Sequence, residues 1–194
     1  MKNLYFAYGS NMSVEQMTKR CPNSLLIGKG FITNHKICFP QIAVTRGLLG
    51  VAGIREGVET DEVYGLIYKL TDEDLELLHT FEGYDKDDIS NSSYFPKHVR
   101  FKLYDEVSAK YISQGSQNVI IYQSNFDNGD DFYVSSDYLL LMLKPMIKYG
   151  LDNNYILKIM EKAKSNPKPS LKVKLKKLRT AKLLTILKVI FNVK

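Results

Sequence analysis

YFAYGSN, residues 5–11, joins a strand pattern directly to a turn pattern near the start of the chain. The first four residues, Tyr5, Phe6, Ala7 and Tyr8, suit a buried strand, whereas Gly9, Ser10 and Asn11 favour a turn. Ser13, with Gln16 three residues later, forms a capping-box pattern for a short helix, whose free N–H groups would point back at the turn. The stretch therefore predicts either an ordinary strand end or a loop that binds a carboxylate or phosphate.

Strand patterns dominate the first two thirds of the chain. EVYGLIYKL, residues 62–70, is apolar on both faces, which is typical of a central strand. Further strands are expected around Phe31–Phe39, Leu49–Arg55, 98–105 (HVRFKLYD) and 118–125 (NVIIYQSN). Two helices should follow at about 136–149, capped by Ser136, and about 154–163. Pro145 predicts a kink or break in the first of them.

TDEDLELLHTFEG, residues 71–83, predicts a helix with a carboxylate in an unusual place. Thr71 is its expected cap and Gly83 its stop, while Glu73, Asp74 and Glu76 are expected in the first turn or facing outward. Leu75, Leu78 and Glu82 share one helical stripe, which should face the core. Burial at the negative end of a helix should raise the pKa of Glu82, as suits a general acid/base. The alternative is a helix that frays early and leaves Glu82 in water.

Charge divides the chain unevenly. Residues 1–161 contain 16 Lys and Arg against 21 Asp and Glu, a net charge of −5, whereas residues 162–194 contain 11 basic residues and no acid, hence +11. We expect a domain over residues 1–163, a linker over 164–170 and a basic amphipathic tail over 171–194. No membrane span or secretory signal is expected, which favours a cytoplasmic protein.

Three stretches in this order, YFAYGSNM, EVYGLIYKL and LELLHTFEG, resemble the γ-glutamylcyclotransferase family, which includes AIG2-like proteins. The resemblance covers about residues 1–163. It implies an α+β fold, with a small mixed β-barrel flanked by helices, to which the basic C-terminal helical tail is added. It also implies an enzyme, a lyase or acyltransferase that forms 5-oxoproline from a γ-glutamyl amine, amino acid or peptide such as glutathione, with no metal or organic cofactor.

The resemblance also assigns residues to roles. Glu82 matches the catalytic Glu of the family, which moves the proton while the substrate's own α-amine attacks its γ-carbonyl. The substrate-binding loop matches Tyr5, Phe6, Ala7, Tyr8, Gly9, Ser10 and Asn11, and Tyr94 matches a tyrosine beyond the Glu-Gly pair. Where the family often has an Asp, this chain has His79, which we expect to be a surface residue. Tyr122 and Tyr138 could line the pocket, but we expect them to pack in the core.

Within the basic tail, residues 171–194, the apolar stretch Leu183–Phe191 is too short to span a bilayer. It suits a helix lying on an anionic membrane surface, which would make the protein membrane-peripheral, or a helix packed on the domain or on a protein partner. Nucleic acid is disfavoured because aromatic residues for base stacking are scarce in the tail. The alternative to an enzyme is a catalytically silent binding or scaffold protein of the same fold, docked through this tail.

Overall fold

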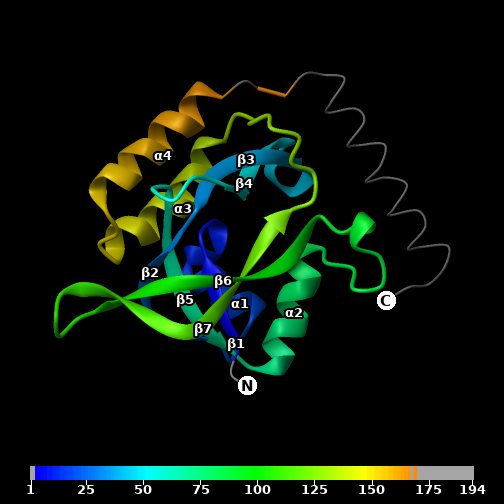
Figure 1. Ribbon diagram of the computed structural model, residues 1–194. Helices are drawn as coiled ribbons and strands as arrows, with labels where there is room; N and C mark the ends of the chain where they lie inside the picture. The colour runs from blue at the N-terminus through cyan, green and yellow to red at the C-terminus, as the bar shows by residue number, and fades with distance from the viewer. Residues whose placement is uncertain (1–2, 167, 170–194) are drawn as a thin grey trace.

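Five strands form a closed mixed barrel in the computed structural model, which describes residues 3–166 and 168–169 (Figure 1). The barrel order is β1 (Asn3–Ala7), β5 (Glu62–Leu70), β2 (Leu25–Thr33), β6 (Tyr94–Asp105) and β7 (Lys110–Ser124). Neighbouring strands are antiparallel except β1 and β7, which close the barrel in parallel with Tyr5 opposite Ile120. The predicted central strand is thus confirmed, because β5 lies between β1 and β2.

A separate two-stranded sheet and four α-helices surround the barrel in the described part of the chain. The sheet pairs β3 (His35–Ala43) with β4 (Leu49–Glu56), and short 3₁₀ turns occur at η1 (Ser10–Met12), η2 (Val44–Arg46) and η3 (Ile89–Asn91). The helices are α1 (Val14–Arg20), α2 (Asp72–Glu82), α3 (Ser136–Lys148) and α4 (Asn153–Ser165). In Figure 1 the joined ends of β6 and β7 extend away from the barrel. The predicted α+β barrel is therefore confirmed.

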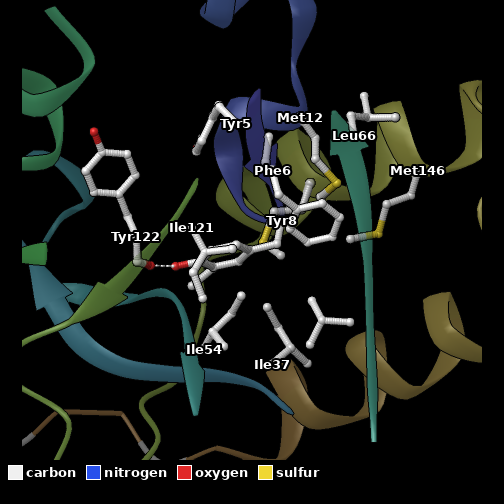
Figure 2. Packing of buried hydrophobic residues seen from close by; sticks show 14 of the residues in the cluster. Tyr5, Phe6, Tyr8, Met12, Ile37, Ile54, Leu66, Ile121, Tyr122 and Met146 are labelled. Atoms are coloured by element: carbon white, nitrogen blue, oxygen red, sulfur yellow. Dashed lines mark hydrogen bonds between the residues drawn. The ribbon is translucent and has the colours of Figure 1, made fainter. Parts of the chain in front are cut away.

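The hydrophobic core contains side chains of the barrel, of the β3–β4 hairpin and of helices α3 and α4. Phe6 of β1 has no exposed surface, and Figure 2 shows it beside Met12 and Tyr8, with Ile37 and Ile54 of the hairpin facing this group. Burial of side chains of this size contributes about 1.5–3 kcal/mol each. This packing fixes the end of β1, where the predicted loop begins.

Several predicted element boundaries were wrong. The strands predicted around 98–105 and 118–125 begin earlier, at Tyr94 and Lys110. The segment Phe31–Phe39 is not one strand, because Asn34 turns the chain with φ +60° and separates β2 from β3. Asn tolerates this left-handed conformation better than most residues. The cap of α3 is Ser135 rather than Ser136, since the Ser135 side chain accepts the N–H of Tyr138.

Pro145 does not break α3, which runs without interruption from Ser136 to Lys148. The proline is itself buried, as are Met142 and Met146 on the same face. Packing of this apolar face offsets the missing backbone hydrogen bond.

Asp74 lies in the first turn of α2, one of the two positions expected for it, but the structure buries it completely. Its Oδ1 accepts the N–H of Asn23 at 3.4 Å, and its backbone oxygen accepts the thiol of Cys21 at 3.4 Å. The first turn of α2 thus packs against the segment that follows α1.

The basic tail predicted for 171–194 lies outside the described residues, as do parts of the predicted linker. Within residues 3–166 and 168–169, no helix has the length and apolar character needed to cross a membrane.

Candidate active site

A cavity of about 400 Å³ opens where the end of β1, the η2 turn, the end of α2 and helix α3 meet. This volume lies within the range of small-molecule pockets. Its lining includes most of the predicted site residues, namely Tyr5, Tyr8, Gly9, Ser10, Asn11, Glu82 and Tyr94. Phe6 and Ala7, the other two, have no exposed surface and belong to the core, so the geometry does not support a direct substrate-binding role for them.

The Gly9–Asn11 segment forms one wall as a 3₁₀ turn. The first hydrogen bond of the turn joins the Met12 N–H to the Gly9 carbonyl at 3.1 Å, so the turn leaves the N–H groups of Ser10 and Asn11 without an internal partner. A Cβ on Gly9 would lie 3.2 Å from the Cβ of Ala52 and 3.4 Å from the Tyr138 hydroxyl. Glycine therefore lets this turn approach β4 and α3 closely.

The capping box predicted behind this turn is only half formed. Ser13 accepts the backbone N–H of Gln16 at 3.3 Å, as expected. The Gln16 side chain instead donates to the Ser10 hydroxyl and to Asn11 Oδ1, each at 3.0 Å. Gln16 thus supports the turn rather than the helix start.

Asn11 connects the turn to the predicted catalytic carboxylate. Its Nδ2 donates to Glu82 Oε1 at 2.8 Å and to the Tyr5 hydroxyl at 2.9 Å, while its Oδ1 also accepts Arg20 Nη1 at 2.9 Å. Because the amide is buried and its oxygen is held by donors, its NH₂ group is directed at Glu82. The sequence motifs did not predict Arg20 as a site residue, since no local pattern links it to Glu82.

Glu82 is the last residue of α2, which Gly83 ends in the left-handed conformation with φ +63°. The side chain is 15% exposed, and Arg20 Nη1 lies 3.6 Å from Oε1. Burial raises the pKa of Glu82, while the charge of Arg20 and the hydrogen bond from Asn11 lower it to a smaller extent. The helix has not frayed before Glu82, and the carboxyl group can take up and release a proton closer to neutrality than an exposed Glu.

Buried tyrosines complete the walls, and their hydroxyls bond mainly within the protein. The Tyr94 hydroxyl donates to the Ala52 carbonyl at 2.7 Å, and the Tyr138 hydroxyl accepts the Ala52 N–H at 3.1 Å. The Tyr8 hydroxyl donates to the Tyr122 carbonyl, as Figure 2 shows. Tyr122 and Tyr138 pack as expected and also line the cavity. Burial raises the pKa of each of these hydroxyls, so they stay neutral.

Two further residues in or beside the cavity were not predicted. Arg46 lies in the η2 turn, where its Nη2 donates to Gln16 Oε1 at 3.3 Å. His79 was expected at the surface, but it is half-buried, with Nδ1 2.7 Å from the Tyr122 hydroxyl. Among the described residues, no three His, Cys, Asp or Glu side chains gather as a metal site would need.

Comparisons with known proteins find similarity in structure alone. No protein-family model matches the chain, and no curated protein does. A solved structure named as a γ-glutamyl cyclotransferase has a TM-score of 0.67 at 22% identity, covering 90% of this chain and 96% of its own. The structure of an uncharacterized protein from Homo sapiens has a TM-score of 0.66 at 24% identity, covering 89% of this chain and 96% of its own.

A γ-glutamyl cyclotransferase from yeast, specific to glutathione, gives a TM-score of 0.56 at 12% identity, covering 84% of this chain and 95% of its own. These likenesses extend over nearly the whole of each related structure. The expectation drawn from the three sequence motifs is therefore confirmed at the level of architecture: this chain has the γ-glutamyl cyclotransferase fold.

Proposed function

We propose that this chain is a γ-glutamylcyclotransferase-like enzyme that releases 5-oxoproline from a γ-glutamyl amine, amino acid or peptide. The observation that carries the proposal is the 2.8 Å hydrogen bond between Asn11 Nδ2 and Glu82 Oε1. It joins the turn suited to an anionic substrate end to a buried carboxyl group with a raised pKa, within one cavity.

In the proposed reaction, ionised Glu82 first removes a proton from the substrate's α-ammonium group, because only the neutral amine is a nucleophile. The amine nitrogen then attacks the γ-carbonyl carbon, and the carbonyl electrons move to the oxygen to give a tetrahedral intermediate. The attacking nitrogen, which now carries a positive charge, loses its second proton to water. When the carbon–nitrogen bond to the leaving amine breaks, protonated Glu82 gives that amine its proton. The products are 5-oxoproline and the free amine, and Glu82 is again ionised.

The remaining cavity residues would bind and fold the substrate. The N–H groups of Ser10 and Asn11 are suited to hold the α-carboxylate or the developing oxyanion. Tyr5, Tyr8 and Tyr94 would pack around the glutamyl chain and hold it in a folded conformation. Such folding contributes much of the rate enhancement, because the attack is intramolecular.

The test is a screen of γ-glutamyl amino acids, glutathione and γ-glutamyl amines for 5-oxoproline formation, with the native protein and Glu82→Gln. Turnover by the native protein that falls at least about 100-fold in Glu82→Gln supports the assignment. A folded native protein without turnover on any of these compounds would instead favour the silent binding or scaffold alternative.

A further inference from the structure

The last turn of α2, which ends in Glu82, is tied to the barrel by a side-chain hydrogen bond. His79 lies one turn before Glu82, and its Nδ1 is 2.7 Å from the Tyr122 hydroxyl on β7. The two rings also meet edge to face, with centroids 5.8 Å apart and planes at 74°. This contact joins the helix that presents the carboxylate to a strand of the closed barrel.

The backbone of His79 also stabilises this turn, by accepting hydrogen bonds from the residues that end the helix. Its carbonyl oxygen accepts the N–H of Tyr84 at 2.9 Å and that of Gly83, as is common at a helix end with a left-handed glycine. The centroid of the Tyr84 ring also lies 4.8 Å from that of the imidazole. His79 therefore takes part both in ending the helix and in docking it.

Tyr122 is itself held firmly in place by the core. Only 1% of its surface is exposed, and its carbonyl oxygen accepts the Tyr8 hydroxyl. Its ring meets the Tyr5 ring at 5.9 Å, and the Tyr5 hydroxyl shares the Asn11 amide with Glu82. The carboxylate is thus held from two directions, by Asn11 directly and by Tyr122 through the helix.

We assign the proton of this hydrogen bond to the tyrosine. Burial raises the pKa of the Tyr122 hydroxyl, so the hydroxyl stays protonated and is able to donate to Nδ1. Burial is also the largest cause of the lowered pKa of His79, against the opposing carboxylate of Glu76 and together with the ammonium of Lys86. The neutral imidazole can accept at Nδ1, whereas the protonated ring cannot.

We propose that His79 is a positioning residue for Glu82, which holds the last turn of α2 against β7 by accepting the Tyr122 hydroxyl hydrogen bond. The inference rests on the proposed function, because it assumes that Glu82 is the general acid/base of the reaction. The hydrogen bond itself can be tested without any substrate.

The first experiment compares His79→Leu, Tyr122→Phe, the double variant and His79→Asn, whose Oδ1 can replace the acceptor. Each single loss should lower kcat about tenfold, the scale of one hydrogen bond that positions a reacting group. The double variant should be no slower than either single variant, because both remove the same interaction. His79→Asn should recover most of the rate, and Leu77→Ala, on the exposed side of α2, should leave it unchanged.

The second experiment follows the Glu82 carboxyl carbon by NMR as pH is varied. In His79→Leu a loosened turn admits water, so the pKa of Glu82 should fall toward its ordinary value, while His79→Asn keeps the native titration. If His79 only adds stability, His79→Leu should lower Tm without changing kcat or the titration of Glu82. That result would overturn the proposal. If no sample turns over any γ-glutamyl compound, the proposed function fails, and the Glu82 titration alone decides the role of His79.

Discussion

Replacing Glu82 by Gln separates the proton transfer of the proposed reaction from the packing of the site. The two side chains have nearly the same shape, so the amide oxygen of Gln can still accept the hydrogen bond that Asn11 now gives to Oε1 at 2.8 Å. Arg20 keeps its other acceptor, Asn11 Oδ1, at 2.9 Å. The variant should therefore fold with its cavity intact but lack a group that can move a proton.

The expected loss in kcat is about 10²–10⁴-fold, the usual contribution of a general acid/base. The free energy of unfolding of the variant, in contrast, should not fall. Because burial raises the pKa of Glu82, the folded state holds its proton more tightly than the unfolded state, and ionising the group costs stability. That cost begins as pH rises past the unfolded pKa, about 4.5, and is complete above the folded pKa. Glu82→Gln avoids it, so the variant should be at least as stable as the native protein at pH 7.

The assay measures 5-oxoproline release by chromatography, together with urea unfolding of both proteins from pH 4 to 8. The matched control is Glu73→Gln, the same change at an exposed position in the first turn of α2. It should leave turnover unchanged. Wild-type turnover by Glu82→Gln on a substrate that the native protein accepts would refute the catalytic assignment. A stability advantage that does not grow with pH would refute the account of the buried carboxyl group.

Three further substitutions test the site and the barrel. Asn11→Ala removes a hydrogen bond that lowers the pKa of Glu82, so the acid side of the kcat/KM profile should move to higher pH and unfolding should become easier by about 1–3 kcal/mol. In Gly65→Ala the new methyl group would meet the backbone of β1, so urea unfolding should show a loss of about 1–3 kcal/mol or more, whereas Gly28→Ala, 3.4 Å from its nearest side chain, should show much less. Leu78→Ala empties a fully buried position, and the same measurement should give a loss of about 2–5 kcal/mol.

Local signals in the sequence were sufficient for the elements that carry the site. Thr71 accepts the N–H of Asp74 and Gly83 adopts φ +63°, so both ends of α2 follow from residue types with known cap preferences. The seven-residue spacing of Leu75 and Glu82 is enough to predict that the carboxylate lies on the inward side of the helix. The period of a helix depends on its backbone alone, which is why this prediction succeeded.

Features set by distant parts of the chain could not be predicted in this way. Asp74 is buried because the segment near Asn23, about fifty residues earlier, packs over it, and its own helix gives no sign of that contact. The hydrogen bond between His79 and Tyr122 likewise joins residues 43 positions apart. Arg20 meets Glu82 only because α1 and α2 lie beside each other, so a single sequence contains no local pattern for this pair.

The parallel closure between β1 and β7 also constrains the order of folding. During synthesis β1 emerges first, but its partners β5 and β7 begin at Glu62 and Lys110. Until they appear, the apolar side chains of β1 have no barrel to enter, and pairing them requires closure of a long loop. The cavity therefore cannot assemble progressively from the N-terminus. The nascent chain must keep β1 from associating with other chains until β7, residues 110–124, has been made.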